Sequence, residues 1–349
     1  TKPTGIFWIY AALIKLTGGS ILALRIAAAA VAGLGGWGLA VAGKRATGSE
    51  RVGVAAGVIY LFISSLFTYY GVSQNTEIFF TAFPIAAGAL AVAARVRTGA
   101  ADPTWHWPMA GLLLGLAMII KPFAAAEALA VGLFLVWFYG VRGQFGRMIG
   151  SGLRLVGGFA LPLLFVYGYY WRLGLIDQLA FYSLEVNSAY PIELPWYLRL
   201  KYMGDYLLRF SPFVILGAGT LVQCRKLKNK DSLTWMHYLL LLFLLVTIVV
   251  LLTGKRFGHY HVQLHPGVSL LAAMWWLPEL TVFAWLRREA VYKRLSLIVG
   301  VLAFFLGTAH YFNYAGKRDE PPKIAAYFEG QLGPNETIFI INGYQATYH

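Results

Sequence analysis

The sequence predicts an all-α polytopic membrane protein. Of its 349 residues, 58% are hydrophobic and only 13% are charged, and the mean hydropathy is +0.62. A soluble globular domain carries charge on about a quarter of its residues. Several apolar stretches also approach the roughly 20 residues that a helix needs to cross a bilayer. Together these observations exclude a soluble globular protein.

Apolar stretches separated by polar loops predict about ten transmembrane helices. The predicted spans cover residues 20–42, 52–71, 76–95, 107–120, 123–141, 152–171, 206–223, 233–254, 264–286 and 295–314. The apolar stretch 6–17 is too short to span and is predicted to be an interfacial helix. We therefore divide this part of the chain into an outer interfacial segment, 1–19, and a transmembrane domain, 20–314.

The C-terminal residues 315–349 differ in character from the spans. A polar linker is followed by helical spacing of apolar residues over 324–332, a turn at 334–337 and a buried-strand pattern at 338–341. Helix, turn and strand in this order predict the beginning of a small α/β domain outside the membrane.

Basic residues gather in alternate loops. Five connections hold most of the loop Lys and Arg, near residues 44–51, 95–97, 142–154, 225–230 and 287–294. Because Lys and Arg are retained on the cytoplasmic side, these loops are predicted to be cytoplasmic and both ends of the chain to lie outside. The net charge of +14 then reflects this bias and anionic lipid headgroups, and we expect no nucleic-acid partner.

Polar side chains at the opposite helix ends are candidates for a functional site. A charged group at the membrane boundary is costly unless it is paired or hydrated. The candidates are Lys2, Arg25, Asn75, Glu77, Lys121, Lys255, Arg256, His259, Tyr260, His261 and His265. Several cations beside a few acids suit a phosphate whose lipid tail stays in the bilayer, because Lys and Arg bind phosphate by charge-assisted hydrogen bonds.

Several of these signals also have a structural interpretation. Asn75 or Thr76 can cap a helix whose first turn holds Glu77. Lys121 can be an anchor that extends to the membrane interface. The aromatic residues of the loop 172–205 can form an interfacial belt, or the loop can close over a substrate.

The segment from Lys255 to Pro266 is the strongest internal signal, because periodicity does not explain its polar cluster. His261 and His265 are four residues apart and can share a helical face. No acid lies near them in sequence, and a metal site usually needs three or four ligands, so we favour phosphate or sugar binding over a metal. The single cysteine, Cys224, excludes an internal disulfide and a cysteine-based metal cluster. No cofactor is assigned.

Several segments resemble the polyprenyl-phosphate-sugar-dependent glycosyltransferases of the GT-C architecture, of the protein mannosyltransferase and aminoarabinose-transferase type. The opening Lys2-Pro3 followed by Trp8 resembles their Lys-Pro-Pro–hydrophobic–Trp segment. Gly115–Pro122 and Arg256–Pro266 resemble two further family segments. The resemblance implies transfer of a sugar from a polyprenyl-phosphate donor to a glycan, lipid or protein acceptor on the outer face of a membrane, such as the bacterial inner membrane.

The resemblance also implies roles for single residues. Glu77 stands where many relatives carry an acid at the mouth of the active cavity, although Asp is more usual in some branches, and it is the internal candidate for a catalytic group. The main base is expected upstream of Thr1, in an outer loop that precedes the Lys-Pro segment in the family. The remaining residues are expected to bind substrate: Lys2, Arg25, Asn75, Lys121, Arg256, His259, Tyr260 and His261.

Two other functions fit the same pattern. A transporter or flippase for a lipid-linked or anionic substrate also has many spans and intramembrane charge, but it normally shows paired halves and helices broken near the midplane. A non-catalytic scaffold of the same architecture is the third reading. Polar groups gathered at one face and the extramembrane tail favour the enzyme.

Overall fold

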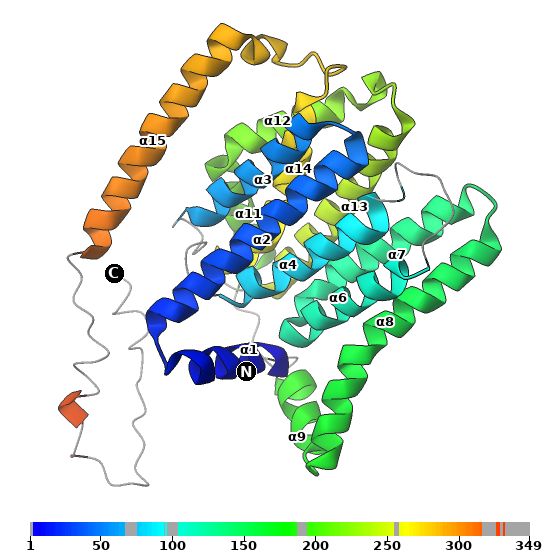
Figure 1. The fold of residues 1–349 in the computed structure, drawn as a ribbon, viewed down its shortest axis with the longest axis vertical. Coiled ribbons are helices and arrows are strands. Elements are labelled where there is room, and N and C mark those ends of the chain that lie inside the picture. Colours follow the sequence, from blue (N-terminus) through cyan, green and yellow to red (C-terminus); the bar gives the residue numbers. More distant parts are fainter. Residues whose placement is uncertain are drawn as a thin grey trace. The chain divides into compact units, whose positions relative to one another are not determined.

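The computed structural model of the chain is helical over the part that it describes (Figure 1). The described residues are 3–66, 75–93, 95, 104–186, 194–254, 258–315, 326–328 and 331. The chain divides into two compact units, Thr1–Val282 and Phe283–His349. The predicted all-α class is confirmed. The predicted turn and strand of the C-terminal domain, residues 334–341, lie outside the described residues.

The first part of unit 1 contains an N-terminal helix, two long helices, and two helices next to the predicted site residues Glu77 and Lys121. These are α1 (Thr4–Thr17), α2 (Ile21–Thr47), α3 (Glu50–Ser65), α4 (Thr76–Gly88), its π-helical continuation η2 (Ala89–Ala93) and α6 (His106–Ile120). Local sequence sets the bounds of α2. The Ser20 side chain accepts a hydrogen bond from the Ala23 N–H, and Gly48 ends the helix with φ 74°.

The rest of the chain alternates longer helices with short 3₁₀ or π segments. Its elements in unit 1 are η3 (Pro122–Ala124), α7 (Ala125–Gly140), α8 (Phe145–Arg172), α9 (Ile176–Ala180), η4 (Phe181–Glu185), α11 (Trp196–Arg209), α12 (Ser211–Val222), η5 (Cys224–Lys226), α13 (Lys230–Thr253), η6 (Gly258–Leu264), α14 (His265–Ala273) and η7 (Met274–Trp276). Unit 2 contains η8 (Ala284–Arg287) and α15 (Glu289–Ala315).

Five helices among the described residues are long and apolar enough to cross a membrane. They are Leu22–Thr47, Thr76–Ala93, Pro122–Gly140, Phe145–Arg172 and Lys230–Thr253, and the bent pair α11–α12 makes a sixth if it counts as one span. Three shorter apolar helices are Thr4–Thr17, His106–Ile120 and Gly300–Ala309. These helices confirm a polytopic membrane protein, and α1 forms at the predicted interfacial segment.

Two predicted spans are not continuous helices. The span predicted at 206–223 breaks after Arg209, and α11 and α12 meet at 92°. Phe210 has a non-helical backbone, and Pro212, which lacks an N–H, stands at the start of α12. The span predicted at 264–286 contains the nine-residue helix α14, followed by the 3₁₀ segment η7, turns and the start of η8. Pro278 lies just beyond η7, where it disfavours a longer helix.

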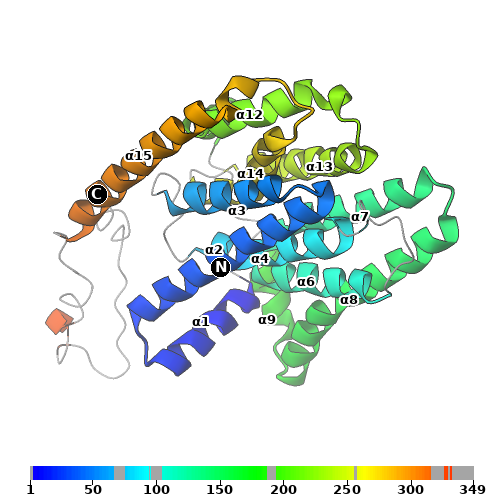
Figure 2. The ribbon, with the colours of Figure 1, turned by 45° about the horizontal axis from the view of Figure 1, so that its top comes forward.

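Glycine allows a close backbone contact between α6 and α8. The Cα of Gly111 faces the Leu155 carbonyl, and the Cα of Gly158 faces the Pro108 carbonyl, so that a Cβ fits at neither position. Figure 2 shows the two helices side by side. Such contact between small residues is a common way for helices to pack in lipid.

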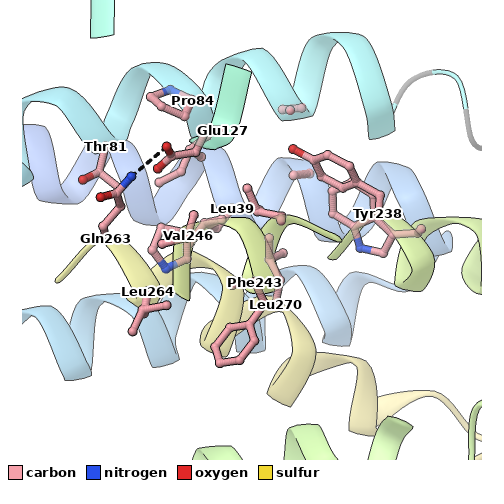
Figure 3. Close-up of a pocket in the computed structure, with 18 residues that line it drawn as sticks. Leu39, Thr81, Pro84, Glu127, Tyr238, Phe243, Val246, Gln263, Leu264 and Leu270 are labelled. Carbon is pink, nitrogen blue, oxygen red and sulfur yellow. Dashed lines mark hydrogen bonds between the residues drawn. The ribbon is translucent and has the colours of Figure 1, made fainter. Parts of the chain in front are cut away.

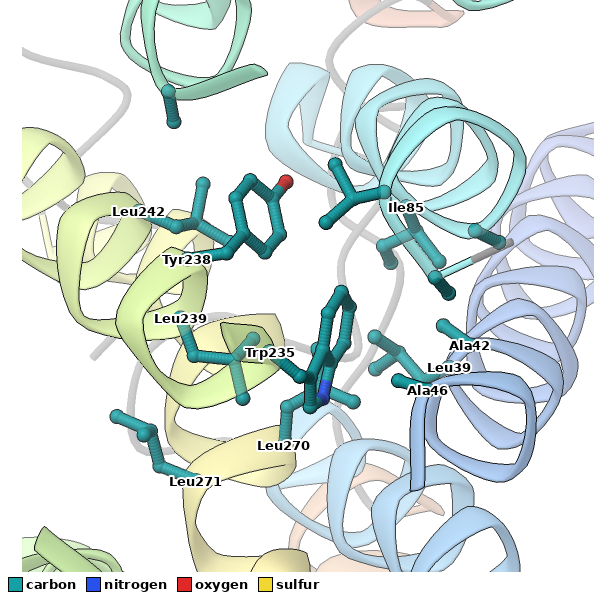
Figure 4. Packing of buried hydrophobic residues seen from close by; sticks show 14 of the residues in the cluster. Leu39, Ala42, Ala46, Ile85, Trp235, Tyr238, Leu239, Leu242, Leu270 and Leu271 are labelled. Carbon is teal, nitrogen blue, oxygen red and sulfur yellow. The ribbon is translucent and has the colours of Figure 1, made fainter. Parts of the chain in front are cut away.

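The main core lies between α2, α4, α13 and α14. In Figure 4, Trp235 and Tyr238 of α13 point toward Leu39 of α2 and Ile85 of α4. A second, smaller cluster joins the start of α4 to α1, the end of α6 and η6. Its buried residues are Ile6, Ala28, Ile78, Phe79, Phe80, Ala117, Ile120, Ala124 and Val262. This second cluster supports the candidate site.

The sequence distinguishes the basic connections from the candidate site residues at the opposite helix ends. Members of these two groups lie at opposite ends of α6. At its start, an Arg95 Nη2 is 3.3 Å from His106 Nδ1, in one of the basic connections. At its end stands Lys121, about 22 Å away along a helix of 15 residues. Which of these ends faces the cytoplasm stays a prediction from the loop charge.

Candidate functional site

Glu77 lies in the first turn of α4 and is almost completely buried. Asn75 occupies the N-cap position with an extended backbone, but its side chain makes no capping hydrogen bond. The acid at the second helical position is favoured by the helix dipole. The side chain of Glu77 is only 2% exposed, so its charge needs a partner.

That partner is Lys121, in the break between α6 and η3. The backbone of Lys121 is extended, with φ −153° and ψ 122°, because Pro122 begins a new segment directly after it. Its ammonium donates a hydrogen bond to Glu77 Oε1, and its side chain is 12% exposed. The structure therefore does not support the reading of Lys121 as an anchor that extends to the membrane interface.

Aromatic rings surround the Lys121 ammonium. Lys121 Nζ is 4.1 Å from the centroid of the Tyr260 ring and 4.8 Å from that of Phe123. The two rings meet edge to face at 5.3 Å. A cation over a ring face is attracted by the ring quadrupole, most strongly where water is excluded. Lys121 is thus held by one carboxylate and two rings.

His259 completes the group. Its Nε2 is 3.8 Å from Glu77 Oε1, and its side chain is 25% exposed, more than those of Glu77 and Lys121. Its ring packs on Tyr260 at 4.7 Å. The structure thus brings together four predicted site residues from distant parts of the chain. We call Glu77, Lys121, His259 and Tyr260 the cation site.

His261 and His265 do not join the cation site. Both rings stack on Tyr206 of α11, with centroids at 5.4 and 5.9 Å, so they do share a face as the spacing predicts. The Nδ1 of His261 is 3.2 Å from the Gly258 carbonyl oxygen, and that of His265 is 3.1 Å from Ser64 Oγ. Burial lowers the pKa of His261 to about 4, so its imidazole is neutral at pH 7. It supplies no positive charge for a phosphate there.

The other predicted residues fall outside this group or outside the described chain. Arg25 is exposed on the first turns of α2. Lys2, Lys255 and Arg256 are not among the described residues. The start of α1 does lie at the site, because Gly5 packs directly on the Ile119 carbonyl at the end of α6. That Lys2 and Arg256 bind substrate together with Lys121 stays a prediction. No group of three or more His, Cys, Asp or Glu in the described part of the chain is arranged to hold a metal ion.

Sequence reasoning missed two polar residues directly behind the cation site. Gln263 Nε2 donates hydrogen bonds to the Phe123 carbonyl oxygen at 3.0 Å and to Glu127 Oε2 at 2.8 Å. Glu127 and Gln263 are 5% and 3% exposed. Glu127 is an acid inside the predicted span 123–141, and an acid at such a position is itself a signal. It lies inside a predicted span and not at a helix end, so it is not among the predicted site residues.

A cavity lies beside this pair. Thr81, Glu127 and Gln263 line one end of it, and mainly apolar residues of α2, α4, α13 and α14 line the rest (Figure 3). The Thr81 hydroxyl donates to the Glu77 backbone carbonyl, which links this end of the cavity to the cation site.

One comparison with known proteins agrees with the family resemblance. A family model described as dolichyl-phosphate-mannose-protein mannosyltransferase matches residues 1–169, which include Glu77 and Lys121 but not His259 or Tyr260. No curated protein and no solved structure matches the chain. The buried Lys–Glu pair thus lies in the matched part. The match over residues 1–169 supports a membrane glycosyltransferase of the GT-C type, similar to the dolichyl-phosphate-mannose-protein mannosyltransferases.

Proposed function

We propose that this chain transfers a sugar from a polyprenyl-phosphate donor to an acceptor at the extracytoplasmic face of the membrane. The family supports the reaction type and implies such a donor. The loop charge supports the side of the membrane. The cation site supports the place where the donor phosphate binds.

The observation that carries the proposal is the position of the Lys121 ammonium. It stands at a helix end, next to α1, between Glu77 and the Tyr260 ring. In a transfer from a lipid phosphate, negative charge grows on the departing phosphate oxygen. A preorganised ammonium at that point stabilises the charge in the transition state. The partial exposure of His259 marks the side from which a ligand reaches the site.

Glu77 has two conceivable tasks, and its contacts favour one of them. Its carboxylate already accepts a hydrogen bond from Lys121 and lies near His259. In this arrangement it orients both side chains, and a donor phosphate competes with it for Lys121. The other task, proton acceptor for the acceptor hydroxyl, requires the carboxylate to leave Lys121 first.

Binding of a polyprenyl phosphate tests the proposal without relying on turnover. We expect Lys121→Ala, in the purified full chain in nanodiscs, to weaken this affinity by about 10- to 100-fold, as for the loss of a charged hydrogen bond. Lys44→Ala is the matched control, because Lys44 also pairs with a glutamate but is exposed. Phosphatidic acid serves as the competitor with a phosphate and no prenyl chain. Equal affinity of Lys121→Ala and the parent chain would contradict the proposal.

A transfer assay then separates the two tasks of Glu77. With a lipid-linked sugar and a broad set of acceptors, turnover that disappears in Glu77→Gln while polyprenyl-phosphate affinity persists makes Glu77 the base. Turnover that falls only together with affinity makes it an orienting residue. Movement of lipid-linked substrate across vesicles without any transfer would support the transporter instead.

A further inference from the structure

We propose that Gln263 and Glu127 are positioning residues that fix Lys121 against Tyr260. They form a clamp inside the membrane domain and touch neither the ammonium nor the expected substrate. The inference deepens the proposed function and rests on it only for the part that Lys121 plays in donor binding.

One side-chain amide makes the clamp. The Nε2 of Gln263 has two hydrogens, and both are used, one toward the Phe123 carbonyl oxygen at 3.0 Å and one toward Glu127 Oε2 at 2.8 Å (Figure 3 shows the second). Phe123 follows Lys121 by two residues, and Gln263 follows Tyr260 by three. The amide therefore ties the turn that carries the ammonium to the segment that carries the ring.

Both tied segments have weak backbone support of their own. Lys121 is extended, and Pro122 has no N–H to donate, so the turn before α7 lacks a regular helical ladder there. Tyr260 lies in η6, a 3₁₀ segment, and 3₁₀ hydrogen bonds have poorer geometry than α-helical ones. A cross-link between two such segments sets the distance of the ammonium from the ring.

The chemistry of the clamp argues against simple filling of space. Glu127 lies in the apolar span Pro122–Gly140, where an acid is costly unless it is hydrogen-bonded. An apolar side chain would fill the same volume at lower cost. Glu127 instead fixes the amide plane of Gln263, because it accepts one hydrogen and leaves the other for Phe123. Glu77 touches Lys121 directly, whereas Glu127 acts through Gln263.

Chemical labelling of Lys121 tests the clamp independently of sugar transfer. The full chain in detergent is treated with acetic anhydride, and acetylation of Lys121 is quantified by mass spectrometry relative to that of Lys44. Lys121 is shielded in the parent protein, with 12% of its side chain exposed against 57% for Lys44. We expect Gln263→Ala to raise the relative labelling of Lys121 about tenfold, the factor that the lost hydrogen bond to the Phe123 carbonyl oxygen supplies.

Two further comparisons separate positioning from general damage. Gln223→Ala is the matched control, since Gln223 Oε1 accepts hydrogen bonds from the Thr281 and Val282 N–H groups far from the site in sequence. It should leave Lys121 labelling unchanged. Glu127→Gln keeps an acceptor oxygen and should label like the parent, whereas Glu127→Ala should label Lys121 several-fold faster. The comparison of the two Glu127 variants tests the clamp if Gln263→Ala does not fold.

Parent-like labelling of Lys121 in Glu127→Ala and in a folded Gln263→Ala would overturn the clamp. Faster labelling of Lys121 together with a weaker polyprenyl-phosphate affinity supports both the clamp and the proposed function. Faster labelling with unchanged affinity keeps the clamp and counts against the phosphate site itself. The two failures are therefore distinguishable.

Discussion

Two Lys–Glu ion pairs of unit 1 have the same chemistry and opposite surroundings. Lys44 and Glu50, in the connection between α2 and α3, are 3.2 Å apart, and their side chains are 57% and 75% exposed. Lys121 and Glu77 are 12% and 2% exposed, and the Lys121 ammonium packs against aromatic rings. In an exposed pair each charge gives up contacts with water for the contact with its partner, so the pair adds little to the stability of the fold. A buried pair has lost that water, so each charge depends on its partner. Burial therefore distinguishes the Lys121–Glu77 pair, which is suited to a functional site, from the Lys44–Glu50 pair at the surface.

The largest expected effect is the loss of one partner of the buried pair. Glu77→Ala leaves the Lys121 ammonium without its carboxylate, and we expect the free energy of unfolding to fall by about 3–5 kcal/mol. The melting temperature of the purified chain in one detergent, compared with the parent, measures this. A loss below about 1 kcal/mol would show that water reaches the pair and that the contrast with Lys44–Glu50 is unimportant.

Replacing both partners sharpens the comparison. In the double variant Glu77→Leu with Lys121→Met, no charge stays buried, so stability should return to within about 1–2 kcal/mol of the parent. Polyprenyl-phosphate affinity should stay lowered as in Lys121→Ala. Both quantities are measured on the same sample, where stability should recover and affinity should not. A double variant as unstable as Glu77→Ala alone would mean that the two side chains act separately.

The smallest effect is expected at the exposed pair. Lys44→Ala should change the free energy of unfolding by about 0.2–1 kcal/mol, with a smaller change at high salt, because exposed charges are screened. Thermal unfolding at low and high ionic strength checks both points. A salt-independent loss of several kcal/mol would contradict the assignment of this pair as a surface pair.

The sequence predicted the ingredients of the cation site better than its internal structure. Glu77, Lys121 and His259 could be placed on one face because each stands at a helix end and the loop charge sorts the ends. That the acid and the lysine form a pair could not be predicted, because 44 residues separate them and periodicity reports on one helix at a time. The different surroundings of His259 and His261 could not be predicted for the same reason. Tyr206, which packs on His261, is distant from it in sequence.

The missed features had signals that pointed to other interpretations. Pro212 marked the break after Arg209, but the apolar run across it favoured one span. Glu127 lies within the predicted span 123–141 and does not stand out there, because a hydropathy window averages one acid with many apolar neighbours. Its partner Gln263 is 136 residues away, and only the folded chain joins them.

The glycine contact between α6 and α8 has a consequence for the depth of the site. Because the backbones touch at Gly111 and Gly158, neither helix can slide along the other without forcing a side chain through the gap. Membrane helices commonly adapt to a thicker or thinner bilayer by tilting or shifting. Here α6 moves only together with the 28-residue α8. We therefore expect the position of Lys121 along the membrane normal to follow that of α8 when the surrounding lipid changes.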